Sequence, residues 1–69
     1  MNIHQALDEI DFSQPRNVKN IRNELLNKNI KISKRGVTYH LNRNKNFSIA
    51  HPLEVGSQKH FVNVWKKLI

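Results

Sequence analysis

The sequence contains no cysteine, only two glycines and two prolines, and only five acidic residues. Without cysteine, neither a disulfide bond nor a thiolate-based zinc site can supplement the core. No apolar run approaches the roughly 20 residues that span a bilayer. The first residues also lack the basic and apolar regions of a signal peptide. We therefore expect a cytoplasmic protein that has no membrane partner.

Length and hydrophobic content predict one small domain. The chain has 69 residues, of which 38% are hydrophobic, and this content argues against intrinsic disorder. A domain of this size buries only about 60% of the surface that its unfolded chain exposes. We expect residues 1–69 to fold as a single domain of marginal stability.

Charge is the strongest global signal. Twelve Lys and Arg residues face five Asp and Glu residues, which gives a formal net charge of +7. Asp8, Glu9 and Asp11 lie in the first eleven residues, where no Lys or Arg occurs, so the net charge from residue 12 onward is +10. Such a field concentrates polyanions at the surface. Nucleic acid is the predicted partner, and solubility or adhesion to a ribosome or membrane surface is the alternative.

Two helices are predicted in the first half of the chain. The first carries four apolar residues at helical spacing, Ile3, Ala6, Leu7 and Ile10. The second covers residues 16–28, with an apolar stripe of Val18, Ile21 and Leu25. Ser13 is its expected N-cap, Pro15 suits its first turn, and Asn29 stands where a left-handed C-cap falls.

A third helix of about ten residues is predicted after Ser33, which can serve as its N-cap. Val37 and Leu41 lie one turn apart and face inward. The opposite face is polar and cationic and includes one aromatic residue: Arg35, Thr38, Tyr39 and Asn42. Lys34 lies on the exposed first turn. Gly36, also in the first turn, weakens the helix by up to about 1 kcal/mol relative to alanine.

The rest of the chain predicts a β-hairpin. Residues 47–50 alternate as in a strand, and residues 52–57 have the composition of a loop. Residues 61–65 are rich in strand-forming side chains and could pair with residues 47–50. A helix capped by Ser57 also fits the spacing of four residues, Phe61, Val64, Trp65 and Leu68. The strand is the favoured interpretation, and Trp65 is expected in the core.

Residues 21–43 resemble the DNA-binding half of winged helix-turn-helix domains of the arginine-repressor type. In that family Glu-Leu opens the positioning helix, and a hydrophobic-Ser/Thr pair precedes a recognition helix with apolar residues four apart. Glu24-Leu25, Ile32-Ser33 and Val37 with Leu41 occupy those places. The resemblance implies an α+β fold of two or three helices followed by a β-hairpin wing. Asn44 stands where the family shows an apolar residue, so the recognition helix must be short.

The chain is also similar to HicA-type mRNA interferase toxins, which have an α-β-β-β-α fold like that of double-stranded-RNA-binding domains. In this alternative, residues 34–36 make the first hairpin, residues 47–52 the third strand and its exit, and residues 57–69 the last helix. Thr38 stands where those toxins carry a catalytic His, and His40 is displaced along the strand. We therefore expect no enzyme activity, and the alternative function is RNA binding without catalysis.

Taken together, these features predict a sequence-specific duplex DNA-binding protein, a small transcriptional or phage/mobile-element regulator. A small basic inhibitor of a nucleic-acid enzyme, bound to that enzyme's acidic surface, is a further alternative. Arg and Lys of the third helix would reach guanine edges, Asn42 an adenine edge, and Tyr39 a thymine methyl or a phosphate. The residues expected at the interface are Lys34, Arg35, Thr38, Tyr39, Asn42, Arg43, Lys45, Lys59 and His60.

No cofactor or metal is expected. Of the four histidines, no pair has His-x3-His spacing, and only His51 and His60 lie within ten residues of each other. The sequence has no Gly-rich phosphate loop, nucleophile elbow or paired carboxylates, and three of its five acids cluster at the start. The expected partner is duplex DNA, or RNA in the alternative fold, and the sequence leaves a homodimer and a protein partner open.

Overall fold

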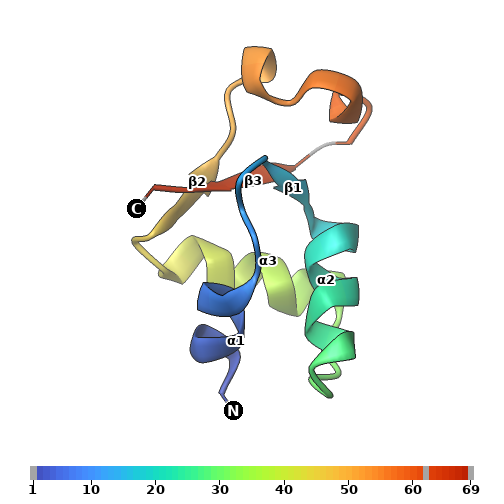
Figure 1. The fold of residues 1–69 in the computed structure, drawn as a ribbon, viewed down its shortest axis with the longest axis vertical. Coiled ribbons are helices and arrows are strands. Elements are labelled where there is room, and N and C mark those ends of the chain that lie inside the picture. The colour runs from blue at the N-terminus through green and yellow to red at the C-terminus, as the bar shows by residue number, and fades with distance from the viewer. Residues whose placement is uncertain (1, 62, 69) are drawn as a thin grey trace.

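The computed structural model describes residues 2–61 and 63–68 and arranges them as three helices beneath a three-stranded antiparallel sheet (Figure 1). The elements in chain order are α1 (Ile3–Glu9), β1 (Arg16–Asn17), α2 (Val18–Asn27), α3 (Lys34–Arg43), β2 (Phe47–Ile49) and β3 (Val64–Lys67). Two 3₁₀ turns, Pro52–Glu54 and Gly56–Gln58, lie in the β2–β3 connection, which projects from the sheet on the side away from the helices. The chain is thus a small α+β fold.

The third helix forms as predicted. The Ser33 hydroxyl accepts a hydrogen bond from the Gly36 N–H at 3.1 Å, and α3 runs for ten residues from Lys34 to Arg43. Val37 and Leu41 are buried on its inner face. The helix ends at Arg43, one residue before the polar Asn44, so its predicted short length is confirmed.

The second helix begins at Val18, two residues later than predicted, and its expected N-cap was wrong. Asn17 caps α2 by accepting a hydrogen bond from the Asn20 N–H at 2.8 Å. The Ser13 N–H instead bonds to the Asp11 carboxylate in a local turn. Ser13 cannot cap α2 because Arg16 and Asn17 are extended as β1. The left-handed cap is confirmed, since Asn29 has φ of 65°.

The first helix is confirmed and starts with a capping box. The Asn2 side chain accepts from the Gln5 N–H at 2.9 Å, and the Gln5 side chain accepts from the Asn2 N–H at 3.2 Å. These two bonds satisfy backbone donors that the first turn of a helix leaves free. Ala6, Leu7 and the following Ile10 are buried, so the predicted apolar face is the one that packs inward.

The sheet has the order β1-β3-β2, so the last strand lies in the middle. The predicted hairpin is confirmed: β2 and β3 are antiparallel, with Ile49 opposite Trp65. The paired part of the second strand starts at Val64 and not at Phe61, and Val62 of the predicted strand lies outside the described residues. Strand β1 was not predicted. It pairs with the other edge of β3, with Arg16 opposite Trp65.

The alternative α-β-β-β-α fold does not match this arrangement. Its first hairpin would lie at residues 34–36, but these residues form the capped first turn of α3. Its last helix would cover residues 57–69, which instead contain β3. In β3 the adjacent Val64 and Trp65 are both buried, and the extended backbone sends their side chains to opposite faces of the sheet.

The hydrophobic core lies between the helices and one face of the sheet. It is made of nine buried residues: Ala6, Leu7, Ile10, Ile21, Leu25, Val37, Leu41, Phe47 and Trp65. Trp65 is only 2% exposed, which confirms its predicted place in the core. Within the described part of the chain, its Nε1–H has no hydrogen-bond partner. An unsatisfied buried donor costs about 1–3 kcal/mol, so burial of the indole ring must outweigh that cost.

Gly36 allows a close approach at the start of α3. A Cβ atom at this position would lie 2.7 Å from Cγ1 and 3.0 Å from Cδ1 of Ile32. Ile32 is half-buried and packs against the core just before the Ser33 cap. Glycine therefore costs helix propensity but leaves the space that the Ile32 side chain occupies.

We predict that Gly36→Ala destabilises the native chain but stabilises an Ile32→Ala variant. Alanine gains about 0.5–1 kcal/mol of helix propensity over glycine, whereas overpacking against Ile32 costs about 1–3 kcal/mol. In the Ile32→Ala variant the overpacking cost is absent, so only the gain in helix propensity remains. Urea denaturation of the four chains of this double-mutant cycle measures both effects. Equal effects of Gly36→Ala in the two backgrounds would contradict the steric role of this glycine.

Candidate nucleic-acid interface

The outward face of α3 carries the side chains that the sequence assigned to it. Lys34, Arg35, Asn42 and Arg43 are exposed, and Tyr39 is 55% exposed. The Arg43 guanidinium carbon lies 5.2 Å from the centre of the Tyr39 ring, one helical turn away, in cation–π geometry. This contact holds two long side chains together on the solvent side of the helix.

Thr38 lies on the same helix but is half-buried. Its hydroxyl donates a hydrogen bond to the Lys34 carbonyl oxygen at 3.1 Å. The hydroxyl proton is therefore used within the helix, and the oxygen keeps its lone pairs. Thr38 can accept a hydrogen bond from a ligand but is not free to donate one.

The first turn of α3 borders a hollow of about 330 Å³ that two other segments help to line. One segment is the start of α2, which contributes Val18 and Lys19. The other precedes β3 and contributes Phe61 and Asn63. With Lys34, Arg35 and Thr38, the hollow combines three cationic side chains with one aromatic ring. Sequence reasoning missed Lys19, although its exposed position on the helix before the predicted recognition helix was a usable signal.

Three further predicted residues, Lys45, Lys59 and His60, lie outside α3 and do not line this hollow. Lys45 is exposed in the turn after the C-terminal end of α3, roughly 15 Å along the helix from its first turn. Lys59 and His60 are exposed in the β2–β3 connection. The His60 ring contacts the Phe61 ring, with 4.3 Å between centroids, so His60 adjoins the hollow, whereas Lys59 lines a different one with Pro52 and Val55.

Burial separates the twelve basic residues into two groups. Four are half-buried, and each lies within 4 Å of an acid: Arg16 with Glu24 at 3.9 Å, Lys28 with Glu9 at 3.6 Å, Lys66 with Glu54 at 3.0 Å and Lys67 with Asp8 at 3.7 Å. The other eight are all exposed, and none forms an ion pair within residues 2–61 and 63–68: Lys19, Arg22, Lys31, Lys34, Arg35, Arg43, Lys45 and Lys59. Such pairs add little stability, about 0–1 kcal/mol each, but they keep the acids away from the exposed cations.

Gln58 links the β2–β3 connection to the start of α2 through three hydrogen bonds, which we call the Gln58 clasp. Its Oε1 accepts from the Asn17 backbone N–H at 3.2 Å and from Asn17 Nδ2 at 2.9 Å. Its Nε2 donates to the Pro15 carbonyl oxygen at 2.7 Å. Asn17 is only 9% exposed and also caps α2, so one side chain joins β1, α2 and the connection. The sequence analysis did not identify this clasp, because its partners are more than 40 residues apart.

A second set of bonds orders the other end of the connection. The Leu53 N–H donates to His51 Nδ1 at 3.1 Å, and the His51 N–H donates to Glu54 Oε1 at 3.0 Å. The Lys66 ammonium donates to the same Glu54 oxygen at 3.0 Å. The hydrogen bond from the His51 N–H and, after it, the hydrogen bond from the Lys66 ammonium lower the pKa of Glu54 below its ordinary value. The connection is thus held to the sheet at both ends.

No protein-family model, curated protein or solved structure matches the chain. In the part of the chain that the structure describes, no three His, Asp or Glu side chains gather as metal ligands. None of the helices described is long and apolar enough to cross a bilayer. The function proposed below therefore depends on the geometry of the α3 surface and on the distribution of its charged side chains.

We predict that Gln58→Ala loosens the β2–β3 connection without unfolding α3. The variant loses three hydrogen bonds and leaves the buried Asn17 amide unpaired, which costs about 1–3 kcal/mol. Hydrogen exchange should speed up at residues 17 and 58 more than at Val37 or Leu41. Ser57→Ala, an exposed change in the same 3₁₀ turn, is the matched control. Equal amide exchange rates in the two variants would contradict the role of Gln58 in holding the connection.

Proposed function

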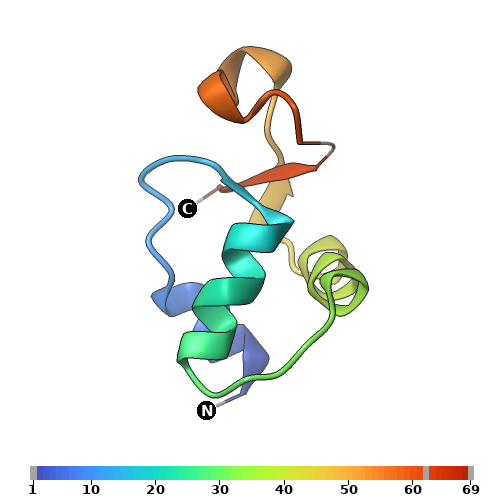
Figure 2. The ribbon, with the colours of Figure 1, turned by 90° about the vertical axis from the view of Figure 1, so that its right-hand side faces the viewer.

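We propose that the chain is a winged helix-turn-helix protein that binds duplex DNA, with α3 as the recognition helix and the β2–β3 connection as the wing. Three features support this proposal. The helices α2 and α3 are joined by a short connection and cross each other; in Figure 2, α2 is upright while α3 is seen nearly end-on. The strand before α2 pairs with the strand after the wing, and the wing follows a strand that leaves α3 directly.

The observation that carries the proposal is the division of basic residues by burial. Eight exposed cations have no acid partner among the described residues, while four half-buried ones do. Free surface cations are what a polyanion needs, because each phosphate they neutralise releases a condensed counterion. Four of the eight lie on α3 or in the turn that follows it, namely Lys34, Arg35, Arg43 and Lys45.

All of the predicted interface residues except Thr38 have a role in this proposal. The first turn of a recognition helix enters the major groove, so Lys34 and Arg35 are placed to read guanine edges. Asn42 lies two turns along the same face and suits an adenine edge. Tyr39, held by Arg43, offers a ring for a thymine methyl group. The contacts to phosphates, which position the protein without reading sequence, fall to Lys19, Lys45, Lys59 and His60.

The proposed action is binding at a defined sequence, as a small transcriptional or phage/mobile-element regulator would require, and not catalysis. Thr38 stands where the toxin resemblance needed a histidine, and its hydroxyl proton is already donated to a backbone carbonyl oxygen. His40 lies on α3 and contacts the rings of His4 and Tyr39. Neither residue has an arrangement that favours the enzyme alternative.

We predict that the identity of α3 side chains sets the preferred DNA sequence. Selection from a random duplex pool should return a different sequence for Arg35→Ala and for Tyr39→Ala than for the native chain. A base-reading Arg should cost about 1–3 kcal/mol of binding free energy at its operator position. Lys59→Ala should weaken all sequences about equally.

Fold controls separate lost recognition from lost structure. Arg35 and Tyr39 are exposed, so their variants should melt like the native chain, whereas Leu41→Ala should cost about 2–5 kcal/mol of stability and abolish binding. If the folded Arg35→Ala and Tyr39→Ala variants select the same DNA sequence as the native chain, α3 is not the element that recognises the bases.

We predict that affinity for duplex DNA falls steeply with salt, because each neutralised phosphate adds about 0.9 to the log–log slope. Lys45→Met should lower the slope by about one unit. Lys28→Met is the matched control, since Lys28 is half-buried beside Glu9 and should leave the slope unchanged. Fluorescence anisotropy over a salt series measures both. A slope near zero, or equal effects of the two variants on the slope, would show that the exposed cations do not contact the DNA phosphates.

A further inference from the structure

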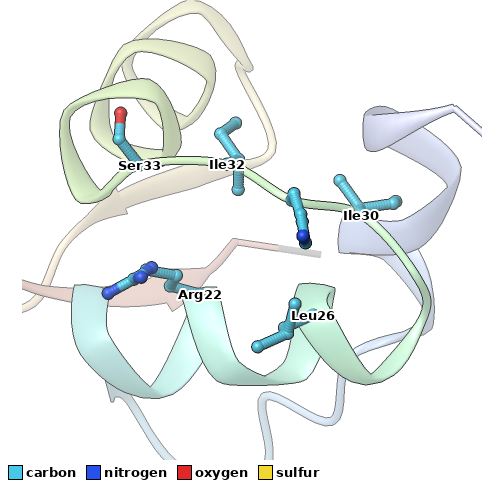
Figure 3. A pocket seen from close by; sticks show the side chains of 6 residues that line it. Arg22, Leu26, Ile30, Ile32 and Ser33 are labelled. Atoms are coloured by element: carbon cyan, nitrogen blue, oxygen red, sulfur yellow. The ribbon is translucent and has the colours of Figure 1, made fainter.

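A groove of about 450 Å³ lies between α2 and the segment that joins it to α3 (Figure 3). Arg22 and Leu26 come from α2, one helical turn apart. Ile30 and Ile32 lie across from Leu26 on the joining segment, and Lys31 and Ser33 complete the lining. The hollow beside the first turn of α3 has none of these lining residues. The groove is thus separate from that hollow.

The groove combines an aliphatic floor with a cationic rim. Leu26 is 48% exposed and lies beside two isoleucines that pack against the core. Arg22 and Lys31 are both exposed and form no ion pair within residues 2–61 and 63–68. A ligand that fills this groove must therefore offer an apolar group together with negative charge.

We infer that this groove docks an acidic amphipathic segment of a partner protein. An aliphatic or aromatic side chain of the partner would cover Leu26, Ile30 and Ile32 and remove their apolar surface from water. Carboxylates on either side of it would meet Arg22 and Lys31 in charge-assisted hydrogen bonds. The proposal does not depend on DNA binding, because the groove is complete in the chain alone.

Other occupants fit the groove less well. A second copy of this chain would bring a net charge of +7 against another +7, and its Asp8, Glu9, Glu24 and Glu54 are already paired with cations of their own chain. A phosphate backbone gains nothing from an aliphatic floor. Nucleic-acid bases stack on aromatic side chains, and the lining contains none. Charge and apolar surface together therefore favour an acidic protein segment.

The test uses a synthetic amphipathic helical peptide of about 18 residues, or five turns, with a leucine stripe flanked by glutamates. It is titrated into the full ¹⁵N-labelled chain without DNA, and amide shifts are followed by NMR. We expect shifts at residues 22, 26 and 30–33. A peptide with Ser in place of Leu should bind about tenfold more weakly. A peptide with Gln in place of Glu should bind about three- to tenfold more weakly.

Variants of the chain make the same test from the other side. Leu26→Asn should weaken the peptide about tenfold, and Arg22→Gln or Lys31→Gln about two- to fivefold each. All three residues are exposed, so their variants should keep the native melting temperature. Arg43→Gln, an exposed cation outside the groove, is the matched control and should leave the affinity unchanged.

Three results would overturn the proposal. The first is no shift with the peptide, or shifts centred on the outward face of α3. The second is equal binding of the Leu and Ser peptides, which would mean unspecific charge attraction. The third is a duplex DNA titration that shifts residues 22, 26 and 30–33, which would assign the groove to nucleic acid. A failure of DNA binding alone would leave the peptide result intact, so the two proposals fail separately.

Discussion

Pairing along both edges of β3 is the constraint on which the rest of the fold depends. Trp65 lies opposite Arg16 on one side and opposite Ile49 on the other, so one strand joins the segment before α2 to the segment after α3. A two-residue strand such as β1 has no stability of its own and exists only through its partner. The start of α2 and its Asn17 cap are therefore positioned by a strand almost 50 residues further along the chain.

The sequence predicted α3 well because the information for it is local. The Ser33 cap, the inward Val37 and Leu41 and the polar end at Asn44 all act within a few residues. The start of α2 was predicted wrongly for the opposite reason. Ser13 before Pro15 has suitable cap chemistry, but pairing with β3 keeps Arg16 and Asn17 extended, so the helix begins only after them. A sequence window around Ser13 contains no trace of that pairing.

The same limit applies to the candidate interface. The α3 face follows from helical periodicity, so Lys34, Arg35, Tyr39 and Asn42 could be named from the sequence. In a linear chain, however, the twelve basic residues look alike. Only folding brings Asp8 to Lys67 and Glu9 to Lys28. The acidic first segment thus does more than lower the net charge, because Asp8 and Glu9 pair with half-buried cations and, among the described residues, with none of the exposed ones.

The groove beside α2 and the hollow beside the first turn of α3 both border the start of α3, where Ser33 lines the groove and Lys34 lines the hollow. Ile32 lines the groove beside α2, and Ser33 next to it caps the helix that carries Lys34 and Arg35. Ile32 can lie there because Gly36 has no Cβ to meet its side chain. A larger residue at position 36 must move the Ile32 side chain, which lines the groove, or displace the capped first turn, and either movement alters one of the two surfaces. The helix propensity lost at Gly36 is therefore linked to the geometry of the groove as well as to the placement of the proposed DNA-reading residues.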